Sequence, residues 1–486
     1  MSFISRRDFL KDSAAVAAAL ASARALTSEA FAFEKKEESN KKESLNDPLR
    51  IAVIGVHGRG NEHVRGYNAL NSCLVTTICD ADSAVVGASM KAVEKARGAT
   101  PKFEQDIRKV LDDKNIDIVS IATPNHWHAL AAIWALQAGK HVYVEKPVSH
   151  NVSEGRRIVE AARKYNRICQ TGTQCRSMPG TRQAMAFLHE GKLGKISVAR
   201  GLCYKARGSI GKVKGPQQIP STVNYDLWCG PAPNKPLERR SLHYDWHWQW
   251  DYGNGDLGNQ GIHQMDVARW GLNKNELAKT VQSVGGRFGY VDDGQTANTQ
   301  ICVFDYGDCE LVFEVRGLPT QKLLGANVGN IFYGTEGYLV CPGYDSAVAY
   351  TPKGEVIRKF GGGADHFDNF LKAVRSGKKE DLNSDILEGH LSSALCHLGN
   401  ISYRLGAEVP FSKDAKAFGD DKEAGETLAR MEQHLKDNAI PLDKATYRLG
   451  PKLTINSKTE SFVDNKAADA MLTREYRKGF EVPEKL

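Results

Sequence analysis

A run of β-branched residues that ends in a glycine-rich turn constrains the fold of this chain most strongly. Residues 49–54 read LRIAVI, which is typical of a strand buried on both faces. The dinucleotide pattern G-x-G-x-x-G follows in altered form, with Gly55 and Gly60 in place, His57 in the middle position and a glycine displaced to Gly58. Because such glycines let backbone approach a pyrophosphate at a helix N-terminus, the turn predicts a nucleotide site. A glycine-rich βα turn without a ligand satisfies the same pattern.

The acid after the next strand indicates which nucleotide would bind. Strand 74–79 ends at Asp80, which lies 20 residues after Gly60, where a ribose-binding carboxylate is expected. A carboxylate there repels a 2′-phosphate, so NAD is favoured over NADP. Asp82 is placed to share or replace this role.

Two further apolar strands, 116–122 and 141–144, flank a helix expected over 129–138. Alternating strands and helices predict a parallel α/β sheet, so residues 49–171 are interpreted as a Rossmann-type dinucleotide-binding domain.

The second half of the chain lacks this alternation. Strands are expected over 195–202, 299–304 and 310–315, the last two joined by turn residues 305–308. Strands without intervening helices predict a large, open, mostly antiparallel sheet over residues 172–410. The fold class is therefore α/β plus α+β. Residues 411–486 form a polar C-terminal extension to which the sequence assigns no function.

Composition excludes several classes of protein. The chain has 486 residues, enough for two or three domains, and a net charge of only +7, which argues against a nucleic-acid partner. It has no uninterrupted apolar run of 18 residues, and its ten cysteines form no CxxC pair.

The N-terminus resembles an export signal. Arg6 and Arg7 precede Phe-Leu-Lys, an apolar stretch covers about residues 14–26, and Ala30-Phe31-Ala32 matches a cleavage site. We expect a twin-arginine signal peptide over 1–32, a polar linker over 33–48, and a periplasmic or extracytoplasmic location. A short amphipathic helix with a chance arginine pair, or an uncleaved anchor, are the alternatives; membrane contact is expected through this segment only.

Two motifs at predicted strand ends make a family resemblance specific. They are residues 122–128, ATPNHWH, and Glu145-Lys146-Pro147. With the glycine turn they resemble the Gfo/Idh/MocA family of glucose–fructose oxidoreductase and inositol dehydrogenase, over about residues 49–406. The resemblance implies that Lys146 reaches substrate beside the nicotinamide, that Lys146–Pro147 is cis, that one sheet face covers the cofactor, and that the other often mediates oligomers. A homo-oligomer, dimer or tetramer, is therefore expected.

A second family signature, Asp-x-Gly-x-His-x-x-Asp, matches at Gly261, His263 and Asp266, but Asn259 replaces its first acid. Asparagine does not titrate, so His263 becomes the best general base, beside Lys146. The spacing places Asn259, His263 and Asp266 on one helical face. A capping or core role for His263 and a structural role for Asp266 stay open.

Residues 243–252, HYDWHWQWDY, combine aromatic rings with polar groups, as a sugar pocket does. A buried aromatic loop or subunit contact is the alternative. No cysteine or carboxylate completes a metal set around these histidines or around His126 and His128, so no metal is predicted.

These patterns predict an exported NAD(P)-dependent oxidoreductase that transfers hydride between a sugar or cyclitol hydroxyl and a tightly bound cofactor, which cannot be replenished outside the cytoplasm. The family resemblance also implies a redox-neutral NAD-dependent glycosidase of the α-N-acetylgalactosaminidase type, and a non-catalytic carbohydrate-binding module remains a third reading. The predicted catalytic residues are Lys146, His263 and Asn259. The predicted cofactor-binding residues are Gly55, His57, Gly58, Arg59, Gly60, Asp80, Thr123, Pro124, Asn125, His128, Glu145, Lys146 and Gln174. The predicted substrate-binding residues are Lys146, Gln174, Trp246, His247, Trp248, Tyr252, Asn259 and His263.

Overall fold

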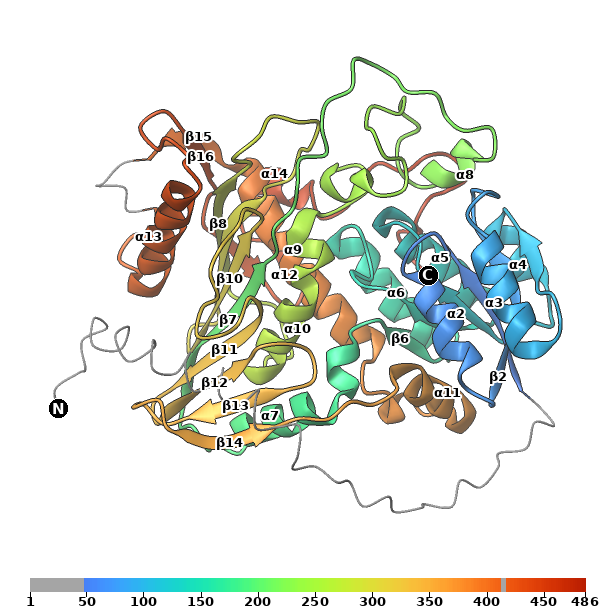
Figure 1. The fold of residues 1–486 in the computed structure, drawn as a ribbon, viewed down its shortest axis with the longest axis horizontal. Coiled ribbons are helices and arrows are strands. Elements are labelled where there is room, and N and C mark those ends of the chain that lie inside the picture. Colours follow the sequence, from blue (N-terminus) through green and yellow to red (C-terminus); the bar gives the residue numbers. More distant parts are fainter. Residues whose placement is uncertain (1–47, 412–416) are drawn as a thin grey trace.

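The computed structural model describes residues 48–411 and 417–486. The predicted signal peptide, and all of the predicted linker except residue 48, lie outside this part. Two β-sheets stand side by side, with helices between them (Figure 1).

The N-terminal sheet is parallel and has six strands in the order β3-β2-β1-β4-β5-β6. This doubly wound order confirms the predicted Rossmann domain, and its topological switch lies where β1 and β4 are neighbours. The strands are β1 (Leu49–Ile54), β2 (Cys73–Cys79), β3 (Lys102–Glu104), β4 (Ile118–Ile121), β5 (His141–Val144) and β6 (Cys169–Thr171), and the helices are α2 (Gly60–Asn68), α3 (Gly87–Arg97), α4 (Ile107–Asp112), α5 (Asn125–Gln137) and α6 (Val152–Lys164).

The second sheet has twelve strands, and among the described pairings only β7 and β10 run parallel. The predicted mostly antiparallel sheet is confirmed, including the β9–β10 hairpin with Asp305 opposite Glu310. The strands are β7 (Ile196–Tyr204), β8 (Thr280–Gly286), β9 (Thr299–Asp305), β10 (Glu310–Arg316), β11 (Val328–Gly334), β12 (Gly337–Cys341), β13 (Ala347–Tyr350), β14 (Val356–Phe360), β15 (Ala407–Pro410), β16 (Thr446–Leu449), β17 (Leu453–Asn456) and β18 (Ser461–Phe462).

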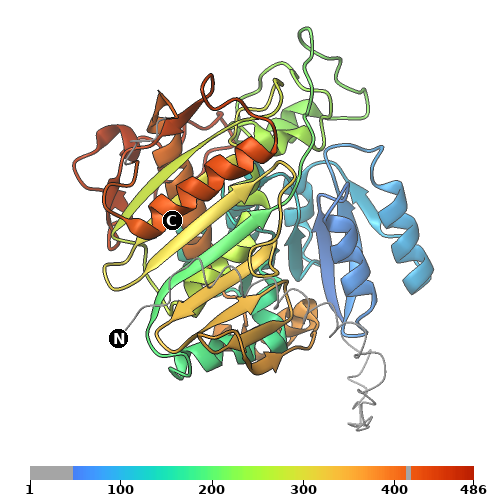
Figure 2. The same cartoon turned by 60° about the vertical axis from the view of Figure 1, so that its left-hand side comes forward.

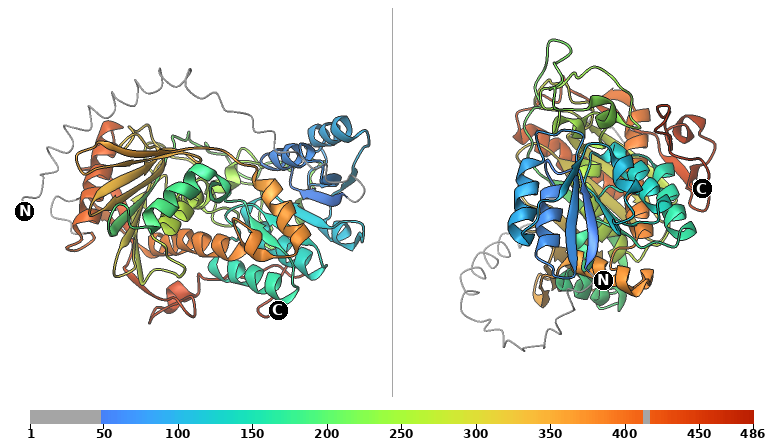
Figure 3. Two further views of the ribbon diagram at one scale, coloured as in Figure 1. Left: turned by 90° about the horizontal axis from the view of Figure 1, so that it is seen from below. Right: turned by 90° about the vertical axis from the view of Figure 1, so that its right-hand side faces the viewer.

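Helices cover both faces of the second sheet. On the face toward the Rossmann domain lie α9 (Gly255–Asn259), α10 (Gly261–Gly271) and α12 (Ile386–Leu405), which packs against both α6 and β8 (Figure 3). On the other face lies α13 (Lys422–Asp437), whose buried leucines join the core of β8, β9 and β10 (Figure 2). The remaining helices are α7 (Pro179–His189), α8 (Tyr225–Cys229), α11 (His366–Ser376) and α14 (Lys466–Asp469). No helix in residues 48–411 or 417–486 is long and apolar enough to cross a bilayer.

The C-terminal residues tie the two domains together. Strand β16 pairs with β15 and β8, so the residues after 411 extend the second sheet. The chain then returns to the Rossmann domain, where the Phe480 ring lies 5.7 Å from that of Trp127 and 6.2 Å from that of Trp134. The C-terminal extension, to which the sequence assigns no function, is thus a structural part of both domains.

We predict that Phe480→Ala lowers the free energy of unfolding by about 3–5 kcal/mol, because the ring is only 5% exposed and its loss leaves a cavity. Urea unfolding followed by tryptophan fluorescence measures the effect. Val463→Ala, at an apolar side chain of the same C-terminal region that is 46% exposed, is the matched control. Equal midpoints for both variants would show that the C-terminal residues do not stabilise the Rossmann domain.

Candidate active site

A cavity of about 360 Å³ lies between the two domains, at the carboxyl ends of the parallel strands. One wall comes from the turns after β1, β2, β4 and β5. The other comes from the end of α9 and from residues 205–252, which connect β7 to α9 and which we call the covering segment. This segment crosses from the second sheet to the Rossmann domain (Figure 1).

The glycine turn after β1 has two tightly packed glycines and one open one. Gly55 has φ +83°, and a Cβ on it would lie 2.8 Å from the backbone nitrogen of Thr123. A Cβ on Gly60 would lie 1.8 Å from the carbonyl oxygen of Gly55. A Cβ on Gly58 would meet nothing within 4 Å, and Gly58 lines the cavity. The displaced glycine therefore keeps open the space in which a pyrophosphate would approach the backbone.

Asp80 follows β2 at the edge of the cavity and is fixed by two backbone donors. Its Oδ2 accepts from Val56 N at 2.8 Å and its Oδ1 from Asp82 N at 3.0 Å. Burial raises the pKa of Asp80, and these two hydrogen bonds oppose that rise. The neighbouring Asp82 is engaged differently, because its Oδ2 lies 2.8 Å from Nε2 of His243 in the covering segment.

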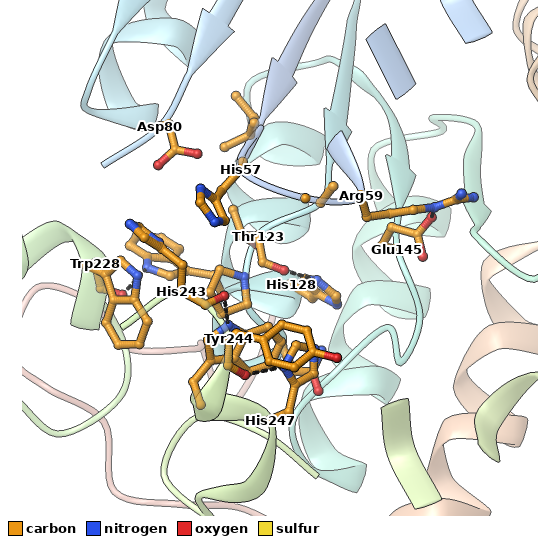
Figure 4. A pocket seen from close by; sticks show the side chains of 18 of the residues that line it. His57, Arg59, Asp80, Thr123, His128, Glu145, Trp228, His243, Tyr244 and His247 are labelled. Atoms are coloured by element: carbon orange, nitrogen blue, oxygen red, sulfur yellow. Dashed lines mark hydrogen bonds and ion pairs between the residues drawn. The ribbon is translucent and has the colours of Figure 1, made fainter. Parts of the chain in front are cut away.

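His57 faces the same covering segment. Its ring stacks on that of His243, with centroids 4.4 Å apart, near Asp80 (Figure 4). Burial and then the adjacent His243 lower the pKa of His57. The residue in the middle position of the altered glycine pattern thus joins the two domains.

The turn after β4 presents unsatisfied polar atoms to the cavity. Thr123 Oγ1 and Asn125 Oδ1 are buried without a hydrogen-bond partner among the described residues, and both side chains, with Pro124, line the cavity. His128 has a bracing role, since its ring nitrogens lie 2.7 Å from the Thr123 carbonyl and 2.6 Å from the Pro147 carbonyl. Open space at Gly58, the acid at Asp80 and these orphaned polar atoms together fit a dinucleotide.

Glu145, at the end of β5, orders the centre of the site. Its Oε1 lies 2.8 Å from Nε of Arg59 and 3.1 Å from Nε2 of His63. Burial alone would raise the pKa of Glu145, but Arg59 and His63 hold it well below its usual value. The glycine turn, α2 and β5 therefore meet at one buried carboxylate.

Lys146 lines the cavity, and its Nζ donates to the carbonyl oxygen of Asn259 at 3.0 Å. The Lys146–Pro147 peptide is cis, as the family resemblance implied. Burial lowers the pKa of Lys146; Glu145 opposes this, whereas Arg59, Lys205 and Arg207 add to it. A lysine in this setting exchanges a proton more readily than one in water.

The helix expected over 259–266 is interrupted at Gln260, where α9 ends and α10 begins. Asn259 lines the cavity and contacts Lys146 through its carbonyl. His263 lies outside the lining residues; it is buried, its Nδ1 has no partner among the described residues, and burial and then Lys146 hold its pKa well below its usual value. Asp266 forms a buried ion pair with Arg176 at 2.8 Å, so its contacts are those of the structural role that the sequence left open.

The aromatic patch divides between the cavity wall and the core behind it. Trp246 and His247 line the cavity and stack with ring centroids 3.7 Å apart. His247 Nδ1 lies 2.6 Å from the Tyr244 carbonyl, which only accepts, so Nδ1 carries the proton and Nε2 keeps a lone pair. Trp248 and Tyr252 are buried outside the lining residues, where Tyr252 Oη donates to the Pro233 carbonyl at 3.2 Å. Gln174 begins the short 3₁₀ turn 174–177 and is also outside the lining.

Sequence reasoning missed several lining residues of the covering segment and its neighbour α9. Lys205 donates to Gln260 Oε1 at 3.1 Å, and Arg207 donates through Nε and Nη2 to Asp256 Oδ1 at 3.1 and 3.0 Å. Tyr244 and His243 also line the cavity (Figure 4). For Lys205 and Arg207 the available signal was their position shortly after the strand predicted over 195–202. For His243 and Tyr244 it was their place inside the aromatic patch.

No group of three or more metal-ligating side chains converges within residues 48–411 and 417–486.

The strand ends of the Rossmann sheet carry an open glycine turn and a fixed acid, and they face the mixed sheet across a shared cavity. This arrangement is that of a two-domain dinucleotide-dependent oxidoreductase. The chain belongs to the Gfo/Idh/MocA family. Residues 49–173 match the model for the oxidoreductase family with the NAD-binding Rossmann fold, and residues 191–438 match the model for its C-terminal alpha/beta domain.

Curated relatives match part of the chain. It is 34% identical over 176 residues to an α-N-acetylgalactosaminidase of Shewanella oneidensis. This match covers 34% of this chain and 38% of that protein. It is 33% identical over 175 residues to a glycosyl hydrolase family 109 protein of Shewanella pealeana. This second match covers 34% of this chain and 38% of that protein. The matched segment thus spans well under half of each relative.

Solved structures share the fold at lower identity. The WlbA dehydrogenase from Bordetella pertussis, in complex with NADH and UDP-GlcNAcA, superposes with a TM-score of 0.55 at 20% identity over 76% of this chain and 100% of that one. Levoglucosan dehydrogenase, in complex with NADH and levoglucosan, superposes with a TM-score of 0.55 at 20% identity. The match covers 73% of this chain and 98% of that one.

We predict that Gly58→Ala weakens nicotinamide dinucleotide binding by about tenfold or more while leaving the thermal midpoint of the cofactor-free protein unchanged. The added methyl group meets no protein atom but occupies the space for the pyrophosphate. Gly60→Ala is the contrasting variant, and should lower the midpoint itself because its Cβ would collide with the Gly55 carbonyl. Cofactor titration and differential scanning fluorimetry measure both effects. Undiminished affinity in Gly58→Ala would place the pyrophosphate elsewhere.

Proposed function

We propose that this protein oxidises a hydroxyl group of a sugar or cyclitol and retains its NAD in the cavity between the domains. The observation that carries the proposal is the continuity of that cavity. It runs from Asp80 and the open Gly58, which suit a dinucleotide, to Lys146 and the Trp246–His247 stack, which suit a sugar ring. When bound, the nicotinamide supplies the acceptance and return of hydride.

Lys146 takes the hydroxyl proton and, once charged, stabilises the developing oxyanion. Its position in the cavity wall and its lowered pKa support this role, whereas His263 lies behind the wall next to it. His247 Nε2 accepts a hydrogen bond from a second hydroxyl, and the ring of Trp246 covers an apolar face of the sugar. Asn259 holds the Lys146 amine through its carbonyl oxygen.

Retention of the cofactor is supported by contacts that fasten the covering segment to the Rossmann domain. Asn224 N donates to the Ala81 carbonyl at 2.8 Å, and Ser83 N donates to the Thr222 carbonyl at 3.1 Å. The Asp82–His243 contact adds a polar link beside the ribose-binding acid. A cofactor below these contacts leaves only if they break, so release is expected to be slow.

The redox-neutral glycosidase is the second candidate, favoured by the match to α-N-acetylgalactosaminidase. In that reaction a transient ketone on the substrate acidifies the neighbouring C–H, a base removes that proton as the glycosidic leaving group departs, water adds to the resulting double bond, and the ketone is reduced again. Lys146 and His247 would serve both reactions, because each begins with removal of a hydroxyl proton.

We further propose export of the folded protein through the twin-arginine pathway and assembly as a homo-oligomer. The N-terminal pattern supports export, and the ten cysteines, all buried and unpaired, are those of a chain that folds in a reducing compartment before it leaves. Such a protein carries its cofactor with it.

The first experiment is an absorbance spectrum of the purified protein near 340 nm, without added cofactor, before and after mixing with sugars and glycosides. We expect a reduced-nicotinamide band that rises with one sugar and falls with a second carbonyl compound. A band seen only transiently during glycosidic cleavage would favour the second candidate. Bound nicotinamide that no compound reduces would favour the carbohydrate-binding module, and the absence of nicotinamide would contradict retention.

Lys146→Ala should reduce turnover by about 10²- to 10⁴-fold and leave cofactor content unchanged, because it removes the proton acceptor but not the nucleotide site. In the wild-type protein the rate should rise with pH through a pKa below the usual value for lysine, since the neutral amine is the active form. Lys192→Ala, at an exposed lysine, is the control. Unchanged turnover in Lys146→Ala would contradict the assigned role.

A further inference from the structure

The cavity between the domains carries more positive charge than its lining carboxylates, Asp80 and Glu145, compensate. Arg59, Lys146, Lys205 and Arg207 all line it. Lys205 and Arg207 are also near enough to lower the pKa of Lys146. These cations therefore share one space, although they come from different domains.

Within the described part of the chain, two of these four basic side chains have carboxylate partners there. Arg59 pairs with Glu145 at 2.8 Å, and Arg207 pairs with the buried Asp256 at 3.0 Å. Lys146 donates to the Asn259 carbonyl and Lys205 to the Gln260 amide oxygen, and both acceptors are neutral. His247 contributes no charge at neutral pH, because burial lowers its pKa to about 3, an effect that Lys146 and Arg207 increase.

The backbone holds Lys205 and Arg207 in place at the end of β7. Lys205 N donates to the Arg316 carbonyl at 3.1 Å and Arg207 N to the Gly317 carbonyl at 2.8 Å, which continues the pairing with β10 beyond the strand. Residues two apart on extended backbone point to the same side. The Arg207 guanidinium is anchored on Asp256, whereas the exposed Lys205 ammonium donates to the neutral Gln260 amide and keeps further donors for a ligand.

We propose that Lys205 binds a carboxylate of the substrate, so that the sugar is a hexuronic acid or a glycoside that contains one. This inference rests on the proposed function and narrows its substrate class. When bound, an oxidised nicotinamide ring would add a positive charge to this cavity and would strengthen the preference for an anionic sugar. Because Arg207 is already paired, one available lysine matches a singly charged carboxylate better than a doubly charged phosphate.

The test compares ligands that differ in charge but little in shape. Binding of D-glucuronate, its methyl ester, D-glucose and D-glucose 6-phosphate is followed by tryptophan fluorescence of the protein as purified, which requires no turnover. We expect D-glucuronate to bind about five- to tenfold more tightly than its ester or D-glucose, with a difference that shrinks as salt is added. D-galacturonate and D-galactose provide a second matched pair.

Lys205→Gln should bring the ratio of acid to neutral affinity close to one, whereas Lys214→Gln, at an exposed lysine of the same segment outside the cavity lining, should keep the wild-type ratio. Equal binding of acids and neutral sugars by the wild-type protein, or a preference that survives in Lys205→Gln, would overturn the inference. Tighter binding of the phosphate than of the carboxylate would also overturn it.

The same ligands are then mixed with the protein and the band near 340 nm is recorded. Preferential acid binding without any change in the band would reject the proposed oxidation and keep the carboxylate site. If only neutral sugars reduced the bound nicotinamide, the carboxylate site would be rejected and the proposed sugar oxidation would stand. The two proposals therefore fail separately.

Discussion

The arrangement of the site depends on one buried carboxylate. Glu145 is 3% exposed, and a charge so removed from water persists only when it is paired. Its partners Arg59 and His63 belong to the glycine turn and to α2, and its own Oε2 accepts from the backbone nitrogen of Lys146 at 3.2 Å. This one group sets the glycine turn, the first helix and the reactive lysine relative to each other.

The covering segment completes what the Rossmann domain begins. Trp127 of α5 donates from Nε1 to the Leu227 carbonyl at 2.8 Å, and His126 Nε2 lies 2.9 Å from the Trp228 carbonyl. These contacts hold the covering segment against α5, and the Trp246–His247 stack of the same segment lines the cavity. Nucleotide and sugar would thus occupy one continuous space, which is the physical condition for transfer between them.

Much of the fold could be predicted because local patterns carry it. The run LRIAVI forms β1 over the same residues, and the predicted hairpin forms with its turn at 306–309, one residue later than expected. The site was less predictable. Trp248 and Tyr252 belong to the same aromatic run as Trp246, and no local pattern distinguishes which rings face the cavity. Asn259 acts through its carbonyl oxygen, a group that every residue possesses, so its side chain carried no signal for this contact.

The sequence by itself determined the parallel nucleotide domain, the positions of Gly58, Asp80 and Lys146, and the family, because glycine conformation, strand burial and motif spacing are local properties. Only the tertiary structure decided that His57 stacks on His243, that the C-terminal residues return to α5, and that Lys205 and Arg207 stand near Lys146. Those contacts join residues from distant parts of the chain. Their geometry follows from how the two sheets pack around α10 and α12, which the spacing of residues along the chain does not encode.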